Sequence, residues 1–169
     1  MADYDWTQFH VHMYYLAPIE DVFARFATST GLESFYVRSA EFTTTGGVTR
    51  LPAEQYQAGD RYHFDYVHSY SHGGEVLAVE ADRLIAFTFG VCEVTIRFRE
   101  LDGATEVDLH QTGCPVEDPD RAWMHVNCRS CWIYFMTNLR SVLAGGPDVR
   151  DFDNREWNDS VSIGWIPPA

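Results

Sequence analysis

Two consecutive stretches decide the fold: residues 92–112, CEVTIRFRELDGATEVDLHQT, and residues 118–144, DPDRAWMHVNCRSCWIYFMTNLRSVLA. In the first stretch, apolar and polar side chains alternate on both sides of Asp102-Gly103, which is typical of a β-hairpin. In the second, apolar residues recur every three or four positions, which predicts one long amphipathic helix. Strands with hairpin spacing followed by one helix predict an antiparallel sheet that the helix covers on one face.

The residues before this hairpin extend the same sheet. Residues 8–16 alternate and predict a first strand, and Pro18 predicts the start of a short helix. A second short helix is expected next, capped by Ser29 or Thr30. Further strands are expected at residues 40–44, 61–67, 75–80 and 84–89, with His72-Gly73-Gly74 leading into the third of them.

The predicted fold class is therefore α+β, in the helix-grip arrangement. A curved antiparallel sheet of about seven strands wraps on a long C-terminal helix, and two short helices follow the first strand. Residues 1–147 form this domain, and residues 148–169 form a tail. The tail contains Phe152, Trp157, Ile163 and Trp165, so it is expected to dock on its own domain or on a second subunit of a homodimer.

Composition and charge exclude several classes of function. The 169 residues carry 25 acids and 12 bases, a formal net charge of −13, and every base is arginine. The absence of lysine excludes a Schiff-base lysine and a phosphate-binding P-loop. The negative charge argues against binding to nucleic acid or to an anionic membrane. Adaptation to high salt and GC-rich codon usage both explain an acidic chain without lysine.

The chain is expected to be a cytoplasmic protein with reduced thiols. No apolar run approaches the roughly 18 residues of a membrane span, and the first residues do not resemble a signal peptide. Four cysteines are too few for a disulfide scaffold at this length. Cys128-x-x-Cys131 has redox spacing, but it falls inside the predicted helix and on its apolar side, which favours buried thiols.

A single helix does not fill a concave sheet, so we predict a cavity between them, lined by aromatic side chains. The hydroxyl groups of Tyr15, Tyr36 and Tyr66 and the amide of Gln111 are expected to orient a ligand, with Phe35 and Tyr36 near the mouth. Close packing of the same rings into a solid core is the alternative. The predicted ligand-binding residues are Tyr15, Phe35, Tyr36, Phe64, Tyr66, Phe87, Phe89, Gln111, Cys128, Trp132 and Phe135.

Candidate catalytic and metal-binding groups are expected on the outer face of the sheet. His10-x-His12 places two imidazoles on one side of a strand, and Asp108 and His110 are expected beside them. Such a set of ligands suits zinc or another divalent metal. Surface histidines are common and the spacing is a weak signal, so a solvated polar face or a dimer contact is the simpler explanation. We therefore assign no metal, no cofactor and no catalytic residue from the sequence.

Short motifs spread over residues 6–150 carry a family resemblance. The motifs are WTQF (6–9), APIEDVF (17–23), AT (27–28), GLESFY (31–36), GD (59–60), WIYF (132–135), NLRS (138–141), GG (145–146) and DVR (148–150). They resemble the family of activator-of-heat-shock-ATPase homologues, which belongs to the START-like (SRPBCC) superfamily. The resemblance is most specific in the terminal helix, and it implies a helix-grip domain with an internal hydrophobic cavity, of the single-domain bacterial type.

Three functions remain open on the sequence. The first is a module that binds a small hydrophobic or aromatic compound in the cavity. The second is an enzyme of the cyclase or hydrolase kind, as in other branches of the superfamily; it needs an internal His, Asp or Glu, and our face assignments place all of these outside. The third, suggested by the resemblance, is a stress-response factor that stimulates a heat-shock ATPase through its acidic surface.

Overall fold

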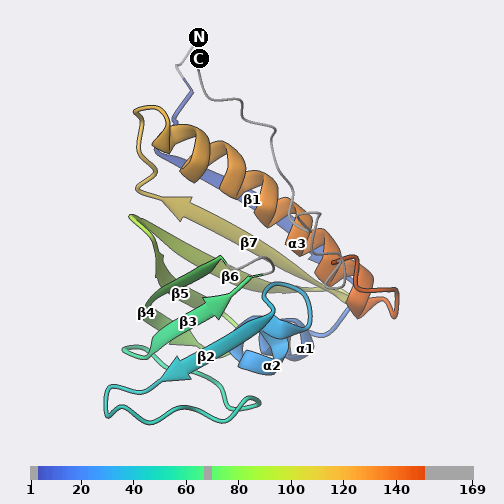
Figure 1. Ribbon diagram of the computed structural model, residues 1–169. Coiled ribbons are helices and arrows are strands. Elements are labelled where there is room, and N and C mark those ends of the chain that lie inside the picture. Colours follow the sequence, from blue (N-terminus) through green and yellow to red (C-terminus); the bar gives the residue numbers. More distant parts are fainter. Residues whose placement is uncertain (1–3, 67–69, 151–169) are drawn as a thin grey trace.

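Seven antiparallel strands form one curved sheet in the computed structural model, which describes residues 4–66 and 70–150. Their order is β1-β7-β6-β5-β4-β3-β2, so the first and last strands of the chain are neighbours (Figure 1). The predicted antiparallel sheet is confirmed. The strands are β1 Gln8–Tyr15, β2 Ser39–Thr43, β3 Arg61–Asp65, β4 Ser71–Glu80, β5 Leu84–Phe89, β6 Cys92–Leu101 and β7 Ala104–Thr112.

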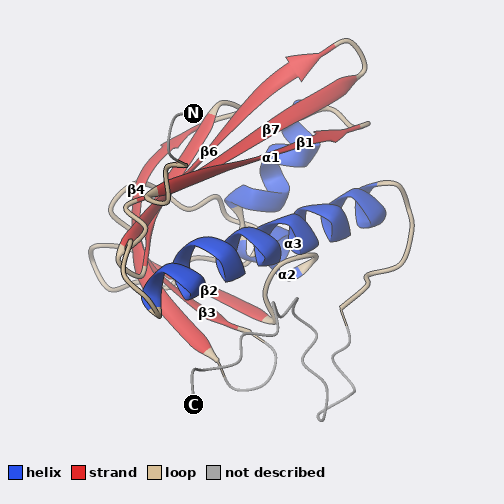
Figure 2. Cartoon of the chain, turned by 90° about the horizontal axis from the view of Figure 1, so that it is seen from above, coloured by secondary structure: helices blue, strands red, loops and turns tan. Residues whose placement is uncertain are grey.

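The long C-terminal helix lies in the hollow of the sheet (Figure 2). It is α3, Cys128–Leu143, and a π-helical segment, η2, Ala122–Asn127, leads into it. The expected helix was α-helical from residue 118 onward, so its N-terminal part differs, with wider turns before Cys128. The two short helices α1, Ile19–Ala27, and α2, Ser29–Glu33, follow β1 as predicted. The α+β helix-grip class is confirmed.

Local sequence signals explain the tight connections. Asp102-Gly103 joins β6 to β7, and Gly103 adopts a positive φ of 72°, which glycine tolerates without strain. The cap of α2 is Thr28, whose hydroxyl oxygen accepts a hydrogen bond from the Gly31 N–H at 3.0 Å. The expected cap at Ser29 or Thr30 is wrong by one or two positions, because the extended Thr28 already separates α1 from α2.

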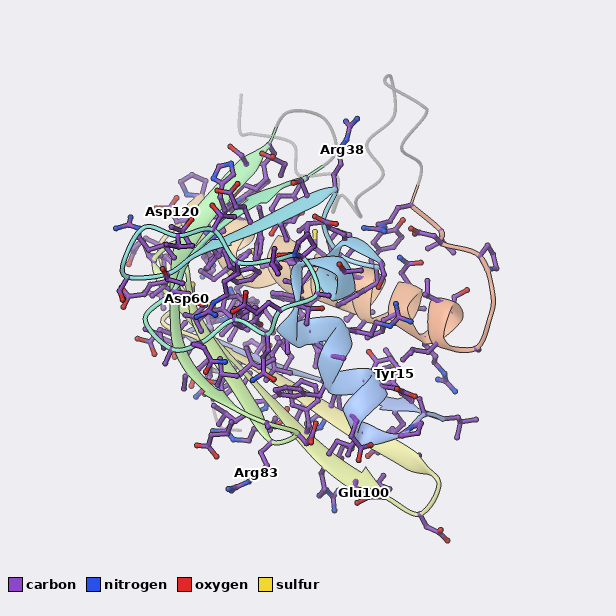
Figure 3. All side chains as sticks on the ribbon, turned by 90° about the horizontal axis from the view of Figure 1, so that it is seen from below. Tyr15, Arg38, Asp60, Arg83, Glu100 and Asp120 are labelled. Carbon is purple, nitrogen blue, oxygen red and sulfur yellow. The ribbon has the colours of Figure 1, made fainter. Side chains whose placement is uncertain are left out.

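The inner face of the sheet, which faces α3, carries the core. Val94, Ile96 and Phe98 of β6 and Val107 and Leu109 of β7 are buried, as their alternation predicts. On the outer face, Arg99 pairs with Glu106 across these strands at 2.6 Å. In Figure 3 the side chains crowd between sheet and helices, while those labelled Arg38 and Arg83 point away from the body of the protein.

The start of the predicted tail packs on the domain. Arg150 is buried; its guanidinium donates to the Val37 carbonyl at 2.9 Å and to the Glu33 carbonyl at 2.7 Å. Asn138 of α3 accepts from the Val149 N–H at 2.9 Å. The apolar residues expected to dock, Phe152, Trp157, Ile163 and Trp165, lie outside the described residues. Within the described residues, no helix is both long enough and apolar enough to cross a membrane.

Candidate functional site: an aromatic pocket beside the long helix

The space between sheet and helices divides into a solid part and a hollow part. The solid part, which we call the packed region, leaves only about 10 Å³ free, no more than one water needs. The alternative of a solid core therefore holds for this half of the molecule. Its lining residues are Phe26, Leu32, Phe35, Tyr36, Phe42, Tyr56, Tyr62, Phe64, Val76, Phe87, Ile96 and Trp132.

The hollow part, which we call the aromatic pocket, has a volume of about 260 Å³. It lies where η2 and the first turns of α3 face the chain around β3, β4 and the end of β5. This volume is close to the range of about 300–1,000 Å³ that is usual for ligand pockets. Its lining residues are Tyr36, Tyr66, Tyr70, His72, Phe89, Gly90, Trp123, Met124, Asn127, Cys128, Cys131, Trp132 and Phe135.

Two stacked rings separate the pocket from the packed region. Tyr36 and Trp132 line both spaces, and their rings stack with centroids 4.9 Å apart and planes 17° apart. The Trp132 indole N–H donates to the Gln111 amide oxygen at 3.0 Å, and the Gln111 amide nitrogen donates to the Met124 carbonyl at 2.9 Å. Gln111 of β7 therefore holds in place both η2 and this pair of rings, Tyr36 and Trp132, which we call the partition.

The predicted ligand-binding residues fall into three groups. Tyr15 and Gln111 are fully buried and line neither space; the Tyr15 hydroxyl donates to the Met136 carbonyl at 3.1 Å. Their polar groups are satisfied by the protein, contrary to the expected contact with a ligand. Phe35, expected near the mouth, has no exposed surface and belongs with Phe64 and Phe87 to the packed region. The predicted residues that do line the aromatic pocket are Tyr36, Tyr66, Phe89, Cys128, Trp132 and Phe135.

His72 is the pocket residue of greatest chemical interest that the sequence analysis missed. Strand β4 begins at Ser71, four residues earlier than expected, and His72 pairs in register with the buried Phe64, so both share the inner face. Gly73-Gly74 resembled a turn. Gly74 instead makes room within the strand, because a Cβ there would lie 2.7 Å from the Tyr62 hydroxyl oxygen. The alternation of His72, Gly74 and Val76 was the available signal.

The expectation that every His, Asp and Glu lies outside is therefore wrong. His72 lines the pocket, and His125 and Asp60 are buried. The Nδ1 of His125 lies 2.9 Å from the Trp6 carbonyl oxygen, which can only accept, so Nδ1–H donates to it. The Nε2 then accepts from the Tyr4 hydroxyl, 3.0 Å away. Hydrogen bonding of the second ring nitrogen explains how a histidine is accommodated in the core.

The described lining of the pocket has no acidic or arginine side chain, and its tyrosines and cysteines are neutral at neutral pH. Burial raises the pKa of Tyr36 and Tyr66 well above the usual value, and raises the pKa of Cys128 to about 12 and of Cys131 to about 11. Burial, and then the nearby charge of His63, lower the pKa of His72. Raised thiol pKa values agree with the interpretation of Cys128-x-x-Cys131 as unreactive thiols.

Hydrogen bonding fixes the proton on His72. The Tyr62 hydroxyl donates to the Thr88 carbonyl at 2.5 Å, so its oxygen accepts from the His72 Nε2–H, 3.0 Å away. The second ring nitrogen, Nδ1, is then an acceptor, and no described residue donates to it. No described carboxylate contacts His72, so the described pocket residues contain no acid–base pair.

Comparison with known proteins identifies the family. A family model described as Activator of Hsp90 ATPase homolog 1-like protein matches residues 16–144. The chain belongs to this family. The match begins directly after β1 and runs through the end of α3, and it confirms the resemblance carried by the sequence motifs. A comparison with curated proteins gave no match.

Solved structures of several other proteins share the fold of this chain. A protein from Staphylococcus saprophyticus has a TM-score of 0.67 at 22% identity, with 85% of this chain and 96% of that chain covered. The Aha1 dimer from Colwellia psychrerythraea has a TM-score of 0.63 at 13% identity, covering 80% and 95%. An HSP90 activator from Plasmodium falciparum has a TM-score of 0.59 at 19% identity, covering 83% and 98%. At these identities the likeness establishes the fold alone.

Proposed function

We propose that this family member is a cytoplasmic binding module, and that its aromatic pocket holds one small, uncharged aromatic compound that carries a hydroxyl group. The observation that carries the proposal is a pocket of about 260 Å³ with aromatic walls and no charged side chain among its described residues. A cavity of about 150 Å³ accommodates benzene, so this volume suits a compound of one or two rings.

The polar groups of the pocket support a hydroxylated ligand. A hydroxyl group would donate to His72 Nδ1, which lacks a donor from the described residues. The Tyr36 and Tyr66 hydroxyl groups lie 2.5 Å apart, so one of them donates to the other and the second retains a proton for a ligand acceptor. A carboxylate ligand is disfavoured, because burying its charge without a cationic partner costs several kcal/mol or more.

Ligand binding is testable through the two tryptophans of the pocket. Trp123 and Trp132 line it, so their fluorescence is expected to change when naphthol is titrated into the protein. Methoxynaphthalene, which cannot donate a hydrogen bond, and naphthoate, which is anionic, are expected to bind at least about tenfold more weakly, or about 1.4 kcal/mol. Equal binding of the three compounds would contradict the assigned role of His72, and binding of none of them would contradict the proposal.

A matched pair of variants separates the pocket from the surface. Cys131→Phe adds a ring inside the pocket and is expected to abolish naphthol binding. Ile133→Phe adds the same ring two residues further along α3, where the side chain is 44% exposed and points to the other side of the helix. It is expected to leave binding unchanged. Loss of binding in both variants would indicate binding at the surface of α3 instead.

A second candidate function rests on the family. Its description names activation of the Hsp90 ATPase, and one neighbour is titled an HSP90 activator. We infer an action of this kind through the acidic surface, since the net charge of −13 favours a basic partner. The rate of ATP hydrolysis by purified Hsp90 is expected to rise with added protein and to return to its basal value with added salt. An unchanged rate would reject this candidate.

The homodimer expected from the sequence belongs to the same proposal, since another neighbour is titled a dimer. Light scattering on the full chain and on a chain that ends at Arg150 measures the mass directly. A dimer in the first case and a monomer in the second would support an assembly through residues 151–169. A monomer in both cases would reject the homodimer.

A further inference from the structure

Three potential metal ligands meet on the outer face of the sheet, on the side opposite the aromatic pocket. His10 and His12 are alternate residues of β1, so both point to the same face. Asp108 of β7 lies opposite His12 in register, and His110 lies opposite His10. One ligand atom from each of His10, His12 and Asp108 lies within 4.8 Å of the other two. The pairing of the first and last strands thus brings together residues 96 or more positions apart in sequence.

We infer that His10, His12 and Asp108 bind one divalent transition-metal ion of the zinc and cobalt class. Zinc bonds of about 2.0–2.1 Å in tetrahedral geometry place neighbouring ligand atoms about 3.3 Å apart. Asp108 Oδ1 lies 3.0 Å from His10 Nδ1 and 3.5 Å from His12 Nε2, close to that separation on both sides. The two histidine nitrogens lie within 4.8 Å of each other, so side-chain rotation is needed to bring the third separation to the same value.

The carboxylate of Asp108 is available for a cation. Arg97 of β6 lies opposite Asp108 in register, but the ion pairs of Asp108 within the described chain are those with His10 and His12. The neighbouring Glu106, by contrast, is engaged by Arg99 at 2.6 Å and by the Tyr14 hydroxyl at 3.1 Å. The net charge of −13 further favours a cation over an anion at this face.

A second layer of contacts orients the first ligand. The His10 ring stacks on the His110 ring with centroids 3.9 Å apart and planes 12° apart. His110 is itself held by a hydrogen bond of 2.7 Å, in which its Nε2–H donates to the Gln8 side-chain oxygen. Such outer contacts fix the rotamer of a ligating histidine before the metal arrives.

The donor set selects the class of metal. Two imidazole nitrogens and one carboxylate oxygen suit Zn²⁺, Co²⁺, Ni²⁺ and Cu²⁺, whereas Mg²⁺ and Ca²⁺ prefer oxygen ligands throughout. Three protein ligands leave at least one position for water, as in zinc sites that exchange ligands. The ligand set is thus open, and the site is distinct from the aromatic pocket, which lies on the other face of the sheet.

Calorimetric titration of the full chain with Zn²⁺ tests the inference, with Mg²⁺ at the same concentration as a second titrant. One Zn²⁺ per chain is expected, and no heat from Mg²⁺. Co²⁺ is expected to give the intense visible absorption of a low-symmetry four- or five-coordinate site. His12→Ala and Asp108→Asn are each expected to weaken Zn²⁺ binding at least about tenfold, since loss of an outer contact alone costs about 10–100-fold.

His63→Ala is the matched control. His63 is exposed on β3 and lies 3.2 Å from Asp65, so it offers a surface histidine–aspartate pair without a second histidine. Its loss is expected to leave Zn²⁺ binding unchanged. His12 is 53% exposed, so its truncation is expected to leave the melting temperature unchanged as well. Absence of Zn²⁺ binding, or equal binding by wild type, His12→Ala and Asp108→Asn, would overturn the inference.

Discussion

The packed region and the aromatic pocket lie side by side under the same sheet, yet one is solid and the other hollow. In the packed region, α1 and α2 supply extra side chains, and rings from β2, β3 and β5 interlock until about 10 Å³ remains. At the pocket, only the rod formed by η2 and α3 faces the sheet, and about 260 Å³ stays open. The difference indicates that the long helix alone leaves a hollow under the sheet, whereas α1 and α2 fill the space in the packed region.

The largest test of this comparison removes a ring from each region. Phe35→Ala is expected to lower the free energy of unfolding by about 3–5 kcal/mol, because a fully buried ring leaves a cavity that close packing does not refill. Phe89→Ala, in a half-buried position beside the open pocket, is expected to cost less than about half as much. Urea denaturation of both variants measures the difference. Equal losses would mean that the pocket wall is packed as tightly as the core.

The next test concerns an ion pair that closes the packed region from outside. Arg50 pairs with the buried Asp60, whose backbone bonds to Val76 in the lining of that region. Burial alone would raise the pKa of Asp60, but hydrogen bonds from Arg50 and from the Gln57 N–H lower it below its usual value. Asp60→Asn is expected to cost about 2–3 kcal/mol, somewhat less than a fully buried pair.

The sign of the pH dependence follows from that lowered pKa. The unfolded chain takes up the proton first, so the stabilisation is complete above the usual pKa of aspartate and is lost as pH falls through the folded pKa. Acid denaturation curves are therefore expected to lose part of their slope in Asp60→Asn. Glu54→Gln is the control, because Glu54 also pairs with Arg50 but is 45% exposed. A cost as large as that of Asp60→Asn would show that burial does not distinguish the two acids.

A smaller effect is expected at the partition itself. Tyr66→Phe removes one of two hydroxyl groups 2.5 Å apart and leaves the Tyr36 hydroxyl without that partner, which is expected to cost about 1 kcal/mol. Tyr70→Phe is the matched control, because the Tyr70 side chain is 50% exposed. Chemical denaturation of both variants provides the measurement. No cost for Tyr66→Phe would indicate that water replaces its hydroxyl at the partition.

The fold could be predicted from the sequence because periodicity determines which face each side chain takes. The alternation across residues 92–112 placed Val94, Ile96 and Leu109 inside, and burial confirms all three. The π-helical turns at η2 had no such signal, since its 6 residues are too few to show a period different from that of the adjoining α-helix. The early start of β4 was hidden because Gly73-Gly74 has the composition of a turn.

The site could be predicted only in part, because a face assignment gives no volume. Phe35 and Phe135 are both inward aromatic residues, yet only Phe135 reaches the pocket. Which ring fills space and which borders it depends on tertiary contacts such as the stacking of Tyr36 on Trp132. Gln111 illustrates the same limit, since its amide was correctly placed inside but is used up by Trp132 and Met124.

The smallest expected effect distinguishes the two regions by their response to pH. Among the residues that the structure describes, none that lines the packed region titrates near neutrality, whereas the pocket has His72, whose pKa is lowered by burial and then by His63. The unfolded chain therefore binds a proton at His72 before the folded protein does, so stability is expected to fall as pH drops below about 6.5.

His72→Gln removes this contribution, so its stability is expected to change less than that of wild type between about pH 8 and about pH 5.5. Burial also lowers the pKa values of His110 and His125, so the stability of the variant still depends in part on pH. Urea denaturation of both proteins at the two pH values measures this change in the free energy of unfolding. The same change in variant and wild type would mean that His72 is as well solvated when folded as when unfolded.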